Sequence, residues 1–205
     1  MTKTEQVPAS RRKGSQTRAD IQQAALSLFT ERGYDATSMR EIAEQLGITK
    51  AALYYHFESK EAIILSLFQD HMRGLDDLLD WAAGRPLTPE LSSEFLGRWI
   101  ALSARRGLRA MRFAAANHAA LRTVMPTREG GPMERIDRAT KLLLSPDAPL
   151  TDRLRIRMAL LGVHNAVLAA QGTEATEDDI LTIAVQAATL LVGDLVPAPR
   201  LPDPE

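Results

Sequence analysis

The chain of 205 residues contains no cysteine, which excludes disulfide bonds, zinc–cysteine sites and thiol catalysis. It has no strong charge of either sign, because its formal net charge is -1, so the total charge gives no indication of a nucleic-acid partner. Long apolar runs are missing as well: the longest, such as residues 158–163, are far shorter than the ~20 residues of a membrane span. Residues 1–18 are polar and contain no apolar signal-peptide core. We therefore expect a soluble, cytoplasmic protein that makes no membrane contact.

Motifs typical of enzymes and metal sites are missing too. The sequence contains no Gly-rich phosphate loop and no GxSxG motif. Its four histidines (His56, His71, His118 and His164) do not have the spacing of metal ligands, and no HExxH motif accompanies them. We therefore expect no catalytic activity, no bound metal and no cofactor.

Apolar residues recur at helical spacing along most of the chain, and no segment shows sustained alternation with a period of two. In the first such segment, Ile21, Ala24, Ala25, Leu28 and Phe29 form one stripe. Glycines, prolines and N-cap residues separate the segments. The pattern predicts an all-α fold of about nine helices, over residues 17–31, 39–46, 50–57, 60–83, 88–105, 108–124, 133–144, 150–170 and 177–195.

The positions of the helix-ending residues and the distribution of charge divide the chain into parts. Residues 1–60 carry nine basic and seven acidic side chains, and the remainder carries sixteen basic and nineteen acidic ones. This mild asymmetry suits an N-terminal contact with nucleic acid. The expected parts are a disordered basic arm (1–14), a first helical domain (15–61), a second helical domain (62–196) and a flexible tail (197–205).

Residues 38–57 have the pattern of a helix-turn-helix. Ser38 and Glu41 have the spacing of a capping box at the start of a short helix. Residues 47–49, Gly-Ile-Thr, form the predicted turn, and Thr49 caps the second helix. On that helix Leu53 and Phe57 face the core of the domain, so the polar and small residues of the helix face outward. Geometry of this kind also occurs in ordinary three-helix bundles.

The outward face of the second helix has the chemistry of a DNA contact. Ala51 and Ala52 permit close approach to the floor of a groove, where their methyl groups can touch a thymine methyl. The hydroxyl groups of Tyr54 and Tyr55 can bond phosphate oxygens at the groove edge. His56 and Lys60 can do the same.

Residues 17–68 resemble the DNA-binding domain of the TetR (tetracycline repressor) family. The matching residues are Ala24, Ala25, Leu28, Phe29, Arg32, Gly33, Tyr34, Thr37, Ser38, Ile42, Ala43, Leu46 to Phe57, Ser59, Lys60 and Glu61. The resemblance covers about a quarter of the chain. It implies that the protein binds double-stranded DNA and is a transcription regulator, usually a repressor that acts as a homodimer on a near-palindromic operator.

The resemblance also implies roles for single residues. Arg40 matches a base-contacting position, although a solvated surface arginine is the alternative. Ser38 either binds phosphate or serves only as a cap. The arm at residues 11–13 either reaches a minor groove or stays unengaged. The expected DNA-binding residues are Thr37, Ser38, Arg40, Thr49, Lys50, Ala51, Ala52, Tyr54, Tyr55, His56 and Lys60.

In this family the rest of the chain typically dimerises and binds a small molecule. The last two predicted helices, 150–170 and 177–195, carry wide apolar faces that suit a four-helix interface, or simply the core of one chain. Trp99, Phe113, Asn117 and His118 combine aromatic surface with polar groups and are the preferred effector contacts. We expect a repressor that a small, largely apolar ligand releases from DNA. A DNA-binding factor without an effector, or an activator, is the alternative.

Overall fold

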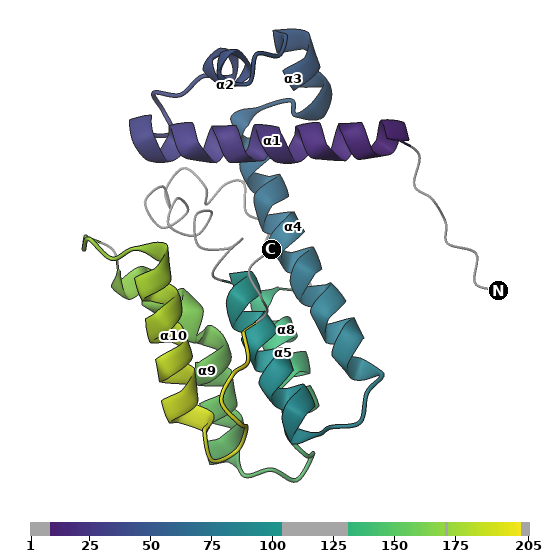
Figure 1. Ribbon diagram of the computed structural model, residues 1–205, viewed down its shortest axis with the longest axis vertical. Coiled ribbons are helices and arrows are strands. Elements are labelled where there is room, and N and C mark those ends of the chain that lie inside the picture. Colours follow the sequence, from purple (N-terminus) through teal and green to yellow (C-terminus); the bar gives the residue numbers. More distant parts are fainter. Residues whose placement is uncertain (1–8, 104–130, 171, 202–205) are drawn as a thin grey trace, which may run out of the picture. The chain divides into compact units, whose positions relative to one another are not determined.

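The computed structural model describes residues 9–103, 131–170 and 172–201. Eight helices and no strand occur in these ranges, which confirms the all-α class (Figure 1). The helices are α1 (Ala9–Arg32), α2 (Met39–Gln45), α3 (Lys50–His56), α4 (Lys60–Ala83), α5 (Pro89–Leu102), α8 (Pro132–Leu143), α9 (Leu150–Ala169) and α10 (Glu177–Val192). The helix predicted over residues 108–124 lies outside the described residues. The chain divides into two compact units, Met1–Leu67 and Phe68–Glu205, and α4 contributes to both.

Helix α1 begins at Ala9, eight residues before the predicted start at residue 17. Residues 9–14, which we expected in a disordered arm, therefore have helical backbone. The prediction placed the start at the first apolar stripe, whereas arginine, lysine and glutamine propagate a helix without one. At its other end α1 is followed by Gly33, whose φ of 89° is in the left-handed region that ends helices.

The first unit has a core made from all of its helices. Its buried apolar side chains are Ile21, Ala24, Ala25, Leu26, Leu28 and Phe29 of α1, Ile42 and Ala43 of α2, Leu53 of α3, Ile63 and Ile64 of α4, together with Tyr34 and Phe57. One buried polar contact joins α1 to α4, because the Gln22 amide donates to the Ser66 hydroxyl at 2.8 Å. The short helices α2 and α3 are thus held by a shared core rather than by their own length.

The second unit has a separate core, between the later part of α4 and helices α5, α8, α9 and α10. Arginine–aspartate pairs add polar contacts at its rim. Arg135 of α8 donates to Asp76 of α4 at 2.5 Å, and Arg138 donates to Asp80 at 2.8 Å. Arg155 of α9 pairs with Asp194, which follows α10. These pairs connect neighbouring helices of the unit.

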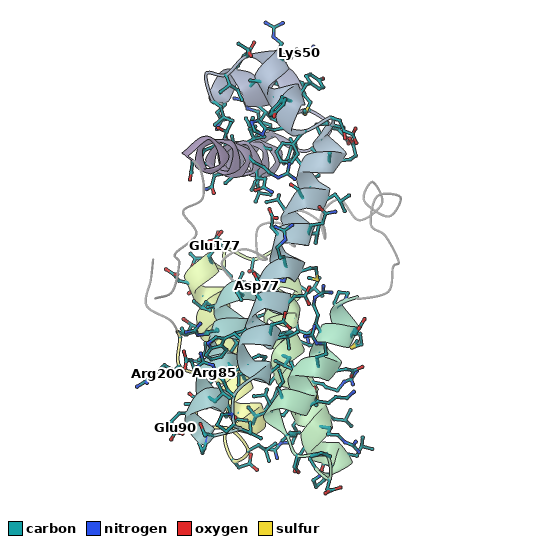
Figure 2. All side chains as sticks on the ribbon, turned by 90° about the vertical axis from the view of Figure 1, so that its right-hand side faces the viewer. Lys50, Asp77, Arg85, Glu90, Glu177 and Arg200 are labelled. Carbon is teal, nitrogen blue, oxygen red and sulfur yellow. The ribbon has the colours of Figure 1, made fainter. Side chains whose placement is uncertain are left out.

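The segment after α10 is docked on α5, although we expected a flexible tail from residue 197. The Arg200 amide donates to the Ser93 carbonyl at 3.2 Å, and the Ser93 hydroxyl donates to the Ala198 carbonyl at 2.5 Å. A Cβ built on Gly97 would lie 1.8 Å from the Arg200 carbonyl oxygen, so only glycine permits this approach. Figure 2 labels Arg200, whose backbone makes the first of these contacts.

Candidate DNA-binding site

Local caps build the helix-turn-helix as predicted. The Ser38 hydroxyl accepts the Glu41 amide at 3.2 Å, and the Ser38 amide donates to the Glu41 carboxylate at 2.8 Å, which completes the capping box. Gly47 takes a φ of 63° in the turn, and the Thr49 hydroxyl accepts the Ala52 amide at 3.1 Å. Hydrogen bonds to Ser38 and the nearby Arg32 hold the pKa of Glu41 below its ordinary value. Glu41 therefore remains an ionised cap at neutral pH.

Helix α3 shows one face to the core and another to solvent. Leu53 is fully buried, while Lys50, Ala51, Tyr54 and Tyr55 are exposed. Tyr55 is 86% exposed, so its ring and hydroxyl are accessible to a binding partner. Figure 2 shows Lys50 projecting into solvent from this helix. Ala52 and His56 are half-buried at the margin of the exposed face.

Weak contacts arrange the side chains on this face. The Lys50 ammonium lies 5.6 Å from the centre of the Tyr54 ring, and the rings of Tyr55 and His56 meet edge to face at 5.2 Å. On α2, the Arg40 guanidinium pairs with Glu44 at 2.7 Å. An exposed pair of this kind contributes little stability, so the guanidinium can exchange its carboxylate for a base or phosphate at small cost.

Two of the expected DNA contacts differ from their predicted settings. Thr37 is 1% exposed, and its hydroxyl donates inward to the Gly33 carbonyl at 2.8 Å. Its side chain is therefore turned into the fold, and the predicted phosphate contact of Thr37 is wrong because the hydroxyl is out of reach of DNA. Lys60 is half-buried, donates to the Tyr34 carbonyl at 2.6 Å and lies 4.2 Å from the Tyr34 ring centre. A phosphate would have to compete for an ammonium that is already engaged.

Tyr34 is a buried packing residue of the first unit. Its ring meets Phe29 edge to face at 5.2 Å, and its hydroxyl donates to the Glu61 carboxylate. Burial, followed by the bond to Glu61, raises the pKa of Tyr34 above its ordinary value. The same bond is the main cause that lowers the pKa of Glu61. Tyr34 thus joins the loop after α1 to the first turn of α4.

Sequence reasoning missed Arg18. Its guanidinium donates to the His56 carbonyl at 3.1 Å and lies 4.2 Å from the centre of the Phe57 ring. Arg18 is on α1, 38 residues from His56, and nothing in the local pattern indicated this pairing. The only available signal was a cation one turn before the apolar stripe that starts at Ile21.

The helix-turn-helix region of the chain resembles that of known regulatory proteins. Residues 21–67 match the sequence profile described as "Bacterial regulatory proteins, tetR family". This stretch of the chain is thus similar to the TetR family. The match begins in α1 and ends in α4, so it contains the whole helix-turn-helix. The profile describes regulatory proteins, in agreement with the expectation of a non-enzymatic chain.

Two curated relatives share sequence with part of the chain. The chain is 40% identical over 78 residues to the HTH-type transcriptional repressor KstR2 of Mycolicibacterium smegmatis, which covers 38% of this chain and 32% of KstR2. It is 54% identical over 39 residues to IcaR, a negative transcriptional regulator of the biofilm operon icaADBC in Staphylococcus aureus, which covers 19% of this chain and 21% of IcaR. The matches thus span about a third and a fifth of the lengths of these relatives.

Solved structures extend the likeness to most of the chain. A TetR-family regulator from Marinobacter aquaeolei VT8 is 25% identical, with a TM-score of 0.58 over 90% of this chain and 93% of that one. A TetR-family protein from Mesorhizobium loti MAFF303099 gives a TM-score of 0.59 over 88% and 97% of the two chains at 19% identity, which shows a shared fold. The likeness includes the C-terminal helices, which the family profile does not match.

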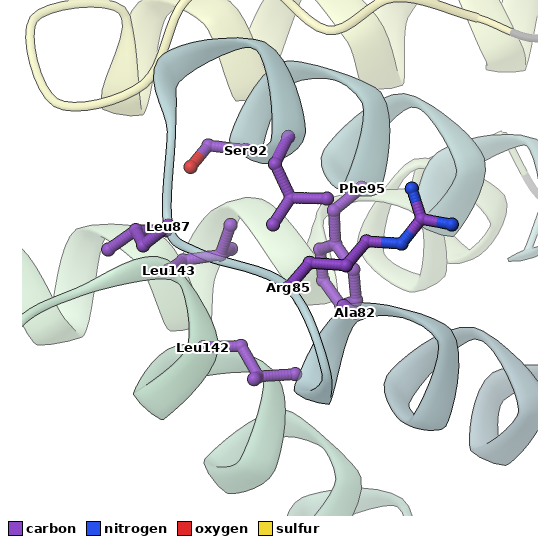
Figure 3. A pocket seen from close by; sticks show the side chains of 8 residues that line it. Ala82, Arg85, Leu87, Ser92, Phe95, Leu142 and Leu143 are labelled. Carbon is purple, nitrogen blue, oxygen red and sulfur yellow. The ribbon is translucent and has the colours of Figure 1, made fainter.

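The expected effector residues are only partly visible. Trp99 is buried in the core of the second unit, where its indole N–H donates to the Leu160 carbonyl at 3.0 Å. Phe113, Asn117 and His118 lie outside the described residues. A hollow of about 20 Å³ near the start of α5 borders Arg85, Ser92 and Phe95 (Figure 3), which is room for one water molecule. Trp99 does not line it, and the effector site remains a prediction.

No helix in the described ranges is both long enough and apolar enough to span a bilayer. In the same ranges, no group of three or more histidine, aspartate or glutamate side chains is placed to hold a metal ion.

Proposed function

We propose that this TetR-family chain is a cytoplasmic, sequence-specific DNA-binding repressor. The observation that carries the proposal is the exposed face of α3. Lys50, Ala51 and Tyr55 lie exposed on a helix whose capped start and buried Leu53 fix which side faces outward. The matched family and the two relatives named as negative regulators support the same activity.

The proposed DNA contacts fall into two groups, those to base edges and those to phosphates. Ala51 and Ala52, together with Lys50 and Arg40, are proposed to meet base edges in the major groove. Tyr54, Tyr55 and His56 are proposed to grip phosphates, which position the helix without reading sequence. The remaining expected contacts, Ser38, Thr49 and Lys60, are proposed to add phosphate contacts, with Ser38 and Thr49 also serving as caps. This division leaves sequence discrimination to the first turn of α3 and to Arg40.

We propose that the protein acts as a homodimer. Helices α9 and α10 pack against each other and keep apolar side chains exposed: Leu154, Met158 and Leu168 on α9, and Ile183 and Leu190 on α10. Leu190 is 85% exposed, although Ile180 and Ala184 of the same helix are buried. An apolar face of this kind on a pair of adjacent helices suits a second copy of the chain related by a two-fold axis. Two α3 helices would then read half-sites about 34–36 Å apart.

Release by a small, largely apolar ligand completes the proposal. The ligand would bind the form of the dimer whose α3 helices have the wrong spacing, so that DNA and ligand oppose each other. A coupling of about 1–3 kcal/mol would weaken DNA binding about 5- to 150-fold. The test is titration of candidate apolar compounds against the protein–operator complex, and failure of every compound to release DNA would count against this part alone.

The decisive experiment for DNA binding is selection from sheared genomic DNA. Purified protein is mixed with the fragments, and the bound fraction is recovered and sequenced. We expect enrichment of a near-palindromic sequence with half-site centres one helical turn apart, or a multiple of it. A variant with Tyr55→Ala and Lys50→Ala, which removes exposed side chains only, should lose the enrichment. Equal recovery of all fragments by the native protein would refute the proposed function.

A further inference from the structure

Helix α3 has few attachments to the rest of its unit. It contains seven residues, and one of them, Leu53, is fully buried. The Phe57 amide closes its C-terminus by donating to the Leu53 carbonyl at 3.0 Å. A helix this short has little stability of its own. Its orientation therefore depends on the residues that hold its two ends.

Arg18 holds the C-terminal end of α3 by two contacts on consecutive residues. Its Nη1 donates to the His56 carbonyl at 3.1 Å, and its guanidinium carbon lies 4.2 Å from the centre of the Phe57 ring. The last carbonyls of a helix have no donor within the helix, and a cation near them is favourable. A planar guanidinium can bond the carbonyl and stack on the ring together, whereas an ammonium has no plane to stack. Arg18 therefore restrains both the position and the rotation of this end.

The restraint acts on the opposite end of the helix, where the proposed base contacts lie. A seven-residue helix is about 10 Å long, so a tilt of about 10° at its C-terminus moves its first turn by roughly 1.7 Å. Recognition side chains must be held within about 0.5 Å and 10–20° of the productive geometry. Loosening of the C-terminal end of α3 would therefore displace Lys50 and Ala51 from their positions for base contact.

From this geometry we infer that Arg18 is a positioning residue for DNA recognition, acting through the end of α3 rather than by touching DNA. The inference rests on the proposed function and adds to it a residue from α1. Arg18 is half-buried and its charge is engaged by the His56 carbonyl and the Phe57 ring. It should accordingly govern the preference for operator over other DNA, and not the general attraction to phosphates.

The test compares two DNA duplexes, one selected by the native full-length protein and one with the same bases scrambled. Arg18→Ala and Arg18→Lys are measured beside Arg73→Ala, which removes one charge from an exposed arginine on α4. Affinity for each duplex is measured across a range of salt concentrations. Amide hydrogen exchange of the peptides covering α2 and α3 shows whether the first unit is folded.

We expect Arg18→Ala to weaken binding to the selected duplex about tenfold or more and to change binding to the scrambled duplex less than about threefold. Arg18→Lys should fall between native and alanine, because it keeps one donor and loses the stack. The salt slope on scrambled DNA should stay unchanged, whereas loss of a direct phosphate contact would reduce it by about 0.9. Exchange should rise in α3 before α2. Arg73→Ala should resemble the native protein on both duplexes.

Three results overturn the inference. They are an equal loss on both duplexes, a reduced salt slope on scrambled DNA, and no loss on either duplex. If Arg18→Ala unfolds the first unit, Arg18→Lys decides: a native ratio of selected to scrambled affinity in that folded variant refutes positioning by the stacked guanidinium. A native protein that selects no sequence refutes the proposed function itself, which distinguishes the two failures.

Discussion

The bond between Tyr34 and Glu61 offers the sharpest test of how the first unit is held together. Tyr34→Phe removes one hydroxyl and keeps the ring that meets Phe29 edge to face. It also keeps the Tyr34 carbonyl that accepts from Lys60. The perturbation is therefore a single hydrogen bond to a carboxylate, in a side chain that is 6% exposed.

The magnitude follows from the partner. A hydrogen bond to a charged group contributes about 1.5–3 kcal/mol. Glu61 is half-buried, so water can replace part of the lost bond, and we expect the low end, about 1.5 kcal/mol. Amides in α1 that exchange through opening of the whole unit should then exchange about tenfold faster.

The pH dependence has a definite sign. The Tyr34 hydroxyl lowers the pKa of Glu61 in the folded state. A carboxyl whose folded pKa is lowered contributes stability that is fully present above its unfolded pKa, about 4.3, and is lost as the pH falls through the lower folded value. The difference between native protein and Tyr34→Phe should thus be constant above about pH 5.5 and shrink below pH 4, towards the ~0.5–1 kcal/mol of a neutral bond.

The assay is amide hydrogen exchange of the full-length protein at several pH values, read from peptides of α1. Both tryptophans, Trp81 and Trp99, lie in the second unit, so their fluorescence unfolding transition should not move. Tyr55→Phe, at an 86% exposed position, is the matched control and should change stability by less than about 0.5 kcal/mol. A difference for Tyr34→Phe below about 0.3 kcal/mol at pH 7, or one that does not shrink in acid, would refute the reasoning.

Three further predictions concern the second unit. Leu190→Glu should raise the dissociation constant of the proposed dimer about 10²- to 10⁴-fold, because each of the two copies loses about 1.5–3 kcal/mol of apolar burial at the interface. Analytical sedimentation measures this constant, with Leu201→Glu as the control variant. Gly97→Ala should destabilise the second unit by about 1–3 kcal/mol in tryptophan-monitored denaturation, because the Arg200 carbonyl must move away from the new methyl group. A loss of stability below about 0.5 kcal/mol, the size of a neutral surface change, would contradict the docking of residues 198–200 on α5. Asp76→Asn should lower the stability of the second unit by about 1–2 kcal/mol, whereas Asp77→Asn, at the exposed neighbouring position, should have little effect. Equal losses of stability in the two variants would show that the contact between Asp76 and Arg135 adds nothing.

The sequence by itself determined the local features of this protein. The capping box of Ser38 and Glu41 spans three positions, and the cap of Thr49 on Ala52 spans three as well. Their partners lie within one helical turn, so the chain can specify them without knowledge of the fold. The helical period likewise placed Leu53 inside and Tyr55 outside, which is most of the proposed recognition face.

Only the tertiary structure decided what joins distant segments. Arg18 reaches a carbonyl 38 residues away, Lys60 reaches one 26 residues away, and Ser93 bonds Ala198 across 105 residues. Thr37 looked like a surface hydroxyl because its burial depends on the way α1 turns at Gly33. Periodicity and capping report on neighbours within a turn, whereas these contacts depend on which helices the shared core brings together. That is why the proposed DNA-binding surface could be predicted from the sequence, and the residue that we infer to hold it in position could not.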